Sequence, residues 1–139
     1  MIGRHDPAVK DSWTLAWGDE HRPVPVRDRA ELDQLLTEAS EEGTTSHTMV
    51  ELVSPSGVSC AIGLGRPRSA VTFSALMVEP PFFLSRGDAT SDESLVFFYN
   101  GHWTEFPPEA GIPVNDALDA LRQFFESGQR PTAVKWDEV

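Results

Sequence analysis

The stretch Leu95–Phe106, with the sequence LVFFYNGHWTEF, decides how the chain is expected to fold. Two apolar runs flank Asn100-Gly101, a dipeptide that readily adopts the positive φ angles of a two-residue type I′ turn. A turn of that length gives four cross-strand pairs: Tyr99–His102, Phe98–Trp103, Phe97–Thr104 and Leu95–Phe106. Both faces of this hairpin are rich in aromatic residues. We therefore expect one face to pack on a helix and the other to be at least partly covered.

Other strands are predicted on both sides of the hairpin. Alternating or apolar runs with turn residues between them are Ser12–Trp17, Thr48–Val53, Val58–Leu64, Ser69–Val78 and Thr132–Trp136. Short linkers between the middle three favour an antiparallel meander. Gly18–Pro25 is predicted to be a loop, because its prolines exclude a central strand. Glu79–Glu93 is predicted to be a long loop, with at most a short edge strand around Phe82–Ser85.

Two helices are predicted from apolar spacing and end signals. The first begins at Asp28, a good N-cap with Glu31 three residues on, and ends at Glu41–Gly43. Its apolar stripe is Leu32, Leu35, Leu36 and Ala39. The second follows the proline-rich Pro107–Pro113, is capped by Asn115, and ends at Gly128. Its apolar stripe is Ala117, Leu118, Leu121, Phe124 and Phe125.

These elements predict an α+β fold, a mainly antiparallel sheet of five to six strands with two helices packed chiefly on one face. We expect residues 1–11 to be a flexible N-terminus and residues 12–139 to be a single domain. No run approaches the roughly 20 apolar residues that a membrane span needs, and the N-terminus lacks the apolar core of a secretion signal. We therefore expect a cytoplasmic protein.

The charge is strongly negative and unevenly distributed. The net charge is −11, and from Val71 to Leu121 the only base is Arg86. The acids of that segment are Glu79, Asp88, Asp92, Glu93, Glu105, Glu109, Asp116 and Asp119. Such a segment repels nucleic acid and anionic membranes and attracts a basic protein. The alternative interpretation is an acidic surface that only keeps the protein in solution.

No set of residues predicts catalysis, a metal or a cofactor. Cys60 is the only cysteine, which excludes an internal disulfide and a Cys-based zinc site. It falls mid-strand on an apolar face, where a free cysteine usually packs as a small hydrophobe. No two histidines have the spacing of metal ligands. Gly63-Leu64-Gly65 lacks the residues of a phosphate-binding loop and is better explained as a turn between strands.

Several short motifs, in order, resemble a known family. They are Gly63-Leu64-Gly65, Phe97-Phe98-Tyr99-Asn100-Gly101, Ile112-Pro113-Val114, Phe124-Phe125, Gly128-Gln129-Arg130-Pro131 and Trp136. With the helix Asp28–Ala39 they resemble a bacterial polymorphic-toxin immunity protein, of the family first described beside deaminase toxins. The resemblance covers roughly residues 28–136. It implies a non-enzymatic α+β domain that binds a cognate toxin and blocks it.

The acidic segment suggests where such a toxin would bind. A toxin that attacks nucleic acid is expected to be basic around its substrate groove, and an acidic inhibitor can occupy that groove. The expected partner-binding residues are Glu79, Phe82, Asp88, Asp92, Glu93, Trp103 and Glu105. We expect no direct binding to nucleic acid or membrane, and either a monomer or a homodimer. Two alternatives stay open: an accessory or regulatory module with another protein partner, and a small enzyme that uses Cys60 or the carboxylates.

Overall fold

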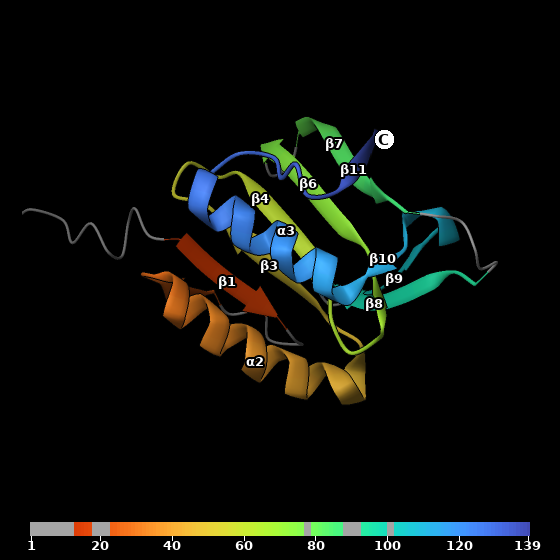
Figure 1. The fold of residues 1–139 in the computed structure, drawn as a ribbon, viewed down its shortest axis with the longest axis horizontal. Helices are drawn as coiled ribbons and strands as arrows, with labels where there is room; N and C mark the ends of the chain where they lie inside the picture. Colours follow the sequence, from red (N-terminus) through yellow and green to blue (C-terminus); the bar gives the residue numbers. More distant parts are fainter. Residues whose placement is uncertain (1–12, 18–22, 77–78, 88–92, 100–101) are drawn as a thin grey trace, which may run out of the picture.

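The central feature is a large antiparallel sheet (Figure 1). The computed structural model describes residues 13–17, 23–76, 79–87, 93–99 and 102–139. In spatial order, its seven strands are β11 (Lys135–Glu138), β7 (Glu79–Arg86), β6 (Val71–Leu76), β4 (Ser59–Gly63), β3 (Met49–Val53), β1 (Trp13–Trp17) and β2 (Val24–Val26). The α+β prediction is confirmed, with seven strands in the main sheet where five or six were expected.

Both helices, α2 (Arg29–Ser46) and α3 (Val114–Ser127), contribute to one core against the sheet. Alternation along the strands turns Leu15, Leu52, Ile62 and Phe73 toward this face, where they pack with the apolar stripes of the helices. At the centre, the buried Phe124 of α3 meets Phe73 edge-on, with 5.6 Å between ring centroids. This side of the sheet carries the larger core and follows the predicted packing.

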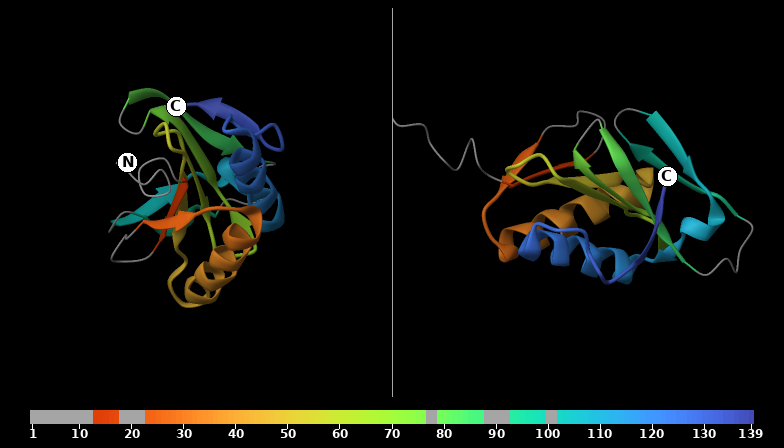
Figure 2. Two further views of the ribbon diagram at one scale, coloured as in Figure 1. Left: turned by 90° about the vertical axis from the view of Figure 1, so that its left-hand side faces the viewer. Right: turned by 90° about the horizontal axis from the view of Figure 1, so that it is seen from above.

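The hairpin forms a separate two-stranded sheet of β8 (Leu95–Tyr99) and β9 (His102–Phe106). All four predicted cross-strand pairs are present, while Asn100-Gly101 lies outside the described residues. The expectation that the hairpin packs on a helix is wrong. It packs instead on the opposite face of the main sheet, through Leu95, Phe97 and Phe106 (Figure 2, right).

The hairpin covers only part of that second face. Its buried side chains pack with Met49, Ala61 and Ala70, at one end of the central strands. Toward the other end, strand register places Thr14, Val53, Ser59, Ser74 and Phe82 in one row across five strands. Of these, Ser59 and Ser74 are buried and Phe82 is exposed. In the described chain, neither α-helix contributes to the cluster on this second face, which takes Ala110 from a short 3-10 turn.

Short elements join the hairpin to the helix layer. A turn of 3-10 helix, η1 (Pro108–Ala110), follows β9 and leads into β10 (Ile112–Pro113), which pairs with β5 (Arg68–Ser69). The backbone N–H of Gly87 donates to the carbonyl of Glu109 at 2.7 Å. The Ser85 hydroxyl, buried at the end of β7, donates to the carbonyl of Ala110 at 2.7 Å. These contacts hold the connection against the main sheet.

Several local expectations are corrected by the structure. Glu79–Arg86 is one eight-residue strand inside the sheet, because β11 pairs with it along the side where solvent was expected. Val24–Val26 forms a strand at the sheet edge, the position where a proline is tolerated. Helix α2 continues past Gly43 to Ser46, and His47, with φ at 47°, ends it in the left-handed region.

Of the two predicted helix caps, the structure confirms one and corrects the other. Asp28 caps α2 as predicted, since its Oδ1 accepts from the backbone N–H of Glu31 at 2.9 Å. Helix α3 starts at Val114 after Pro113, and no side chain caps it. Asn115 therefore lies inside the helix. Gly128 ends α3 with φ at 72°, as predicted.

Candidate functional site

The outer face of the hairpin carries the most exposed aromatic side chain of the described chain. Strand alternation turns Val96, Phe98, Trp103 and Glu105 away from the main sheet. Trp103 is 62% exposed. Its ring meets Phe98 edge-on, with 5.3 Å between centroids and 74° between planes. Apart from this contact, the indole is open to a partner.

Contacts from three directions hold the hairpin in place. On its inner face, the Phe97 ring packs directly over Gly63 of β4, where a Cβ would lie 2.5 Å from two ring atoms. The Tyr99 hydroxyl donates to Glu51 Oε2 at 2.9 Å. At its edge, the backbone N–H of Phe98 donates to the carbonyl of His47 at 2.9 Å. The outer face is therefore presented by a fixed platform.

The buried polar contact beneath the hairpin changes proton affinities. Glu51 is 9% exposed and lies on the face of β3 that the hairpin covers. Burial, and then the neighbouring Glu51 carboxylate, raise the pKa of the Tyr99 phenol above its usual range. Tyr99 consequently stays protonated and serves as a hydrogen-bond donor to Glu51. Its role is to fix the hairpin.

Exposed acidic groups lie on the hairpin, on η1 and at the start of α3. Glu105, Glu109 and Asp116 are exposed, and none forms an ion pair within the described residues. The sequence has no lysine or arginine between Arg86 and Arg122. Arg86 itself bonds to Asp137 at 3.1 Å. Glu105 thus presents an exposed carboxylate on the outer face of the hairpin.

The expected partner-binding residues fall into three groups. Trp103 and Glu105 lie two residues apart on the outer face of β9, and Glu93 is exposed just before β8. Phe82, 36% exposed, lies on β7 of the main sheet and not on the hairpin. The side chain of Glu79 and all of Asp88 and Asp92 lie outside the described part of the chain. The structure thus brings Trp103 and Glu105 together and puts Phe82 on another element.

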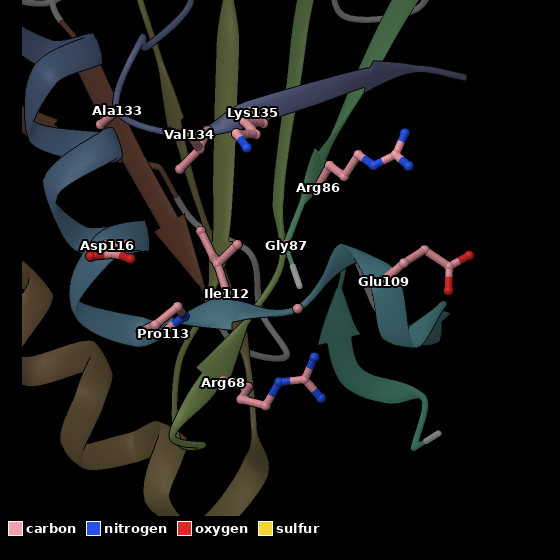
Figure 3. Close-up of a pocket in the computed structure, with 11 residues that line it drawn as sticks. Arg68, Arg86, Gly87, Glu109, Ile112, Pro113, Asp116, Ala133, Val134 and Lys135 are labelled. Atoms are coloured by element: carbon pink, nitrogen blue, oxygen red, sulfur yellow. The ribbon is translucent and has the colours of Figure 1, made fainter. Parts of the chain in front are cut away.

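An open cleft of about 780 Å³ was not anticipated from the sequence. It lies where β7 and β11 meet β10 and the start of α3 (Figure 3). Three cations line it, Arg68, Arg86 and Lys135, together with Glu109 and Asp116. The Arg68 guanidinium donates to the carbonyl of Pro108 at 2.9 Å. These residues are remote in sequence, and no local pattern signals that they meet.

The cysteine is placed as a core residue and not as a nucleophile. Cys60 is fully buried in β4 on the helix side of the sheet. Burial, with a smaller effect of Glu51, raises the pKa of its thiol. This opposes formation of the thiolate that nucleophilic attack requires. Within the described residues, no three His, Cys, Asp or Glu side chains are grouped to hold a metal ion.

Comparison with known families places the chain among bacterial immunity proteins. It belongs to the family described as immunity protein Imm1, whose model matches residues 20–138. The resemblance seen in the sequence is thereby confirmed at the level of the family, and an immunity protein acts by binding a cognate toxin. No curated protein matches the chain. Neither helix in the described ranges is long and apolar enough to cross a bilayer.

Proposed function

We propose that this chain is the immunity protein of a polymorphic toxin system, and that it neutralises its cognate toxin by stoichiometric binding in the cytoplasm, without catalysis. The observation that carries the proposal is the family match over residues 20–138. The buried environment of Cys60 supports a binding role, because it offers no activated nucleophile. The exposed groups around the hairpin are suited to contact with another protein.

The toxin we propose is basic and acts on nucleic acid, as a deaminase or a nuclease does. A protein that handles nucleic acid gathers lysine and arginine along its substrate groove to meet the phosphates. Glu105 on the outer face of the hairpin is exposed and forms no ion pair within the described residues. A charge placed in this way accelerates association and favours the basic surface over other partners. The proposed contact surface comprises Glu79, Phe82, Asp88, Asp92, Glu93, Trp103 and Glu105.

A matched pair of charge reversals tests the electrostatic part. Glu105→Lys and Glu38→Lys change the net charge equally, but Glu38 is exposed on α2, in the helix layer. The ligand is the C-terminal domain of a candidate cognate toxin, made catalytically inactive by substitution. Glu105→Lys should slow association at least several-fold at low salt, and the difference should shrink as the salt concentration rises. Glu38→Lys should change the association rate little.

Two results would contradict this part of the proposal. Equal effects of both reversals would mean that only the net charge matters. An unchanged rate and an unchanged salt dependence in Glu105→Lys would remove the acidic surface from the contact. Growth of cells that make the active toxin, with and without this chain, tests the immunity function itself. A lack of protection would point to an accessory or regulatory module with another partner.

A further inference from the structure

We propose that the outer face of the β8–β9 hairpin anchors the complex, with the Trp103 indole entering an apolar pocket of the toxin while Glu105 meets basic residues at the rim of that pocket. This inference rests on the proposed function and deepens it. It assigns the main binding energy to one element, and it separates Trp103 from Phe82, with which it was grouped by sequence.

The indole of Trp103 is unusually exposed for a large apolar side chain. Trp103 is 62% exposed, whereas the aromatic rings that face the sheet from the same hairpin are buried. Within the described chain, the other exposed large apolar residues are Phe82 on β7 and Val139 after β11. Tryptophan is strongly enriched among the residues that dominate protein–protein binding. Since the ring touches Phe98 by one edge, most of its surface is available to a pocket.

The side chain of Trp103 is held in place before a partner binds. Phe98 supports the indole edge-on, and the backbone of Phe98 is tied to His47 by its N–H at 2.9 Å. The inner face is locked by Phe97 over Gly63 and by the Tyr99–Glu51 hydrogen bond. An anchor that is already held in place loses little conformational freedom on binding, and more of its contact energy appears as affinity.

The charge of Glu105 indicates which kind of partner binds this face. Glu105 lies on the same outer face as Trp103, two residues further along β9, and it has no ion-pair partner among the described residues. A second copy of this chain docked hairpin to hairpin would bring acidic groups toward one another. Like charges placed together at an interface cost affinity. A basic partner with an apolar pocket meets both the indole and the carboxylate.

The outer face of the hairpin is dispensable for folding. The hairpin is held by Leu95, Phe97 and Phe106, which pack with the sheet through the opposite face. Removing the Trp103 side chain leaves these contacts intact. A substitution of Trp103 should therefore change binding without changing the stability of the fold.

The experiment compares Trp103→Ala with Phe82→Ala, which removes the other exposed aromatic ring of the proposed contact surface, from β7. Because a few residues carry most of the energy of an interface, the two contact residues should contribute very unequally. Affinity is measured by isothermal titration calorimetry, with the inactive toxin domain described above titrated into each purified variant. Dissociation rates are measured by surface plasmon resonance. We expect Trp103→Ala to weaken binding about 100-fold, mostly through faster dissociation. Phe82→Ala should weaken it less than about three-fold. Thermal unfolding of both variants checks that each remains folded.

The outcomes separate this inference from the proposed function. Binding by the wild-type chain supports the function whatever the variants do. If the wild type binds and Trp103→Ala binds equally well, or if Phe82→Ala shows the large loss, the hairpin anchor is overturned and the function stands. If the wild type alone is a dimer that Trp103→Ala dissociates, a second copy occupies the face and the inference is overturned. If the wild type does not bind, the proposed function fails at that step.

Discussion

The two sides of the central sheet differ in what they leave exposed. On the helix side, ion pairs link exposed groups of the two helices: Arg122 bonds to Asp33 across the helices at 3.0 Å, and Arg29 bonds to Asp33 within α2 at 3.2 Å. On the hairpin side, Glu105 has no such partner and Trp103 stands in solvent. These ion pairs on the helix side are formed within the protein itself. The other side leaves an exposed indole, and a carboxylate that forms no ion pair within the described residues.

The two sides of the sheet therefore contribute differently to stability and to the exposed surface. The helix side holds the larger core, with Phe124 in contact with Trp13 and Phe73. The hairpin uses a smaller cluster that fixes its position without engaging its outer face. Changes on the two sides should therefore have different consequences, and three measurements test how far this difference holds.

The largest effect is expected at Phe124 on the helix side. The ring is fully buried and its centroid lies 5.0 Å from that of Trp13. Phe124→Ala should lower the free energy of unfolding by about 3–5 kcal/mol, because it leaves a cavity in the core. Trp103→Ala should lower it by less than about 0.5 kcal/mol. Urea denaturation measures both, and similar losses would show that the outer face of the hairpin is structural.

An intermediate effect is expected at alkaline pH, with one titrating group on each side. Burial raises the pKa of Cys60 on the helix side and of Tyr99 beneath the hairpin. The unfolded chain then loses these protons first, from about pH 8.5 for a thiol and about pH 10 for a phenol. The stabilisation is complete below those values and is lost as the pH rises, by up to about 1.4 kcal/mol per pH unit for each group.

Two variants assign the alkaline loss to its source. Tyr99→Phe should abolish the part that begins near pH 10, and Cys60→Ala the part that begins near pH 8.5, as followed by urea denaturation across the pH range. If the slope of stability against pH is the same in both variants as in the wild type, other groups control the alkaline transition. The buried environments would then not be the cause.

The smallest effect is expected at the helix starts, within the helix side. Asp28→Ala removes the oxygen that accepts from the N–H of Glu31 and should cost about 1 kcal/mol. Asn115→Ala is the control, because Asn115 is exposed and caps nothing; it should change stability by less than about 0.5 kcal/mol. Thermal unfolding distinguishes them. A larger loss in Asn115→Ala would contradict the observed start of α3.

Local chemistry predicted the register of the hairpin but not its place in the fold. Asn100-Gly101 and the alternation around it specify which residues pair, since both act within a few residues of the turn. The apolar face with Leu95 and Phe97 has no feature that distinguishes a helix from a sheet as its support. Its packing on Met49 and Ala61 depends on contacts distant in sequence. The strand Glu79–Arg86 was missed for a similar reason, because its prolines suggested a loop while β11 completes its pairing.

The sequence suggested which residue types belong to the candidate site, but it did not show how they are arranged in space. The run of acids without bases is visible in the sequence, but its members lie on several elements, Glu105 on β9 and Asp116 on α3 among them. Sequence placed Trp103 in the hairpin and Phe82 outside it, but it could not show where the two lie relative to one another, because that depends on how the hairpin docks. The cleft lined by Arg68, Arg86 and Lys135 had no signal at all, since its residues come from separate elements.

The contact between Gly63 and Phe97 links two positions in evolutionary terms. A single carbon added at position 63 would lie 2.5 Å from the Phe97 ring, and overfilling a packed site costs about 1–3 kcal/mol. The hairpin can relieve such a clash only by moving, and Trp103 would move with it. A lineage that replaces Gly63 must therefore also reduce the side chain at position 97, or change the partner that it recognises.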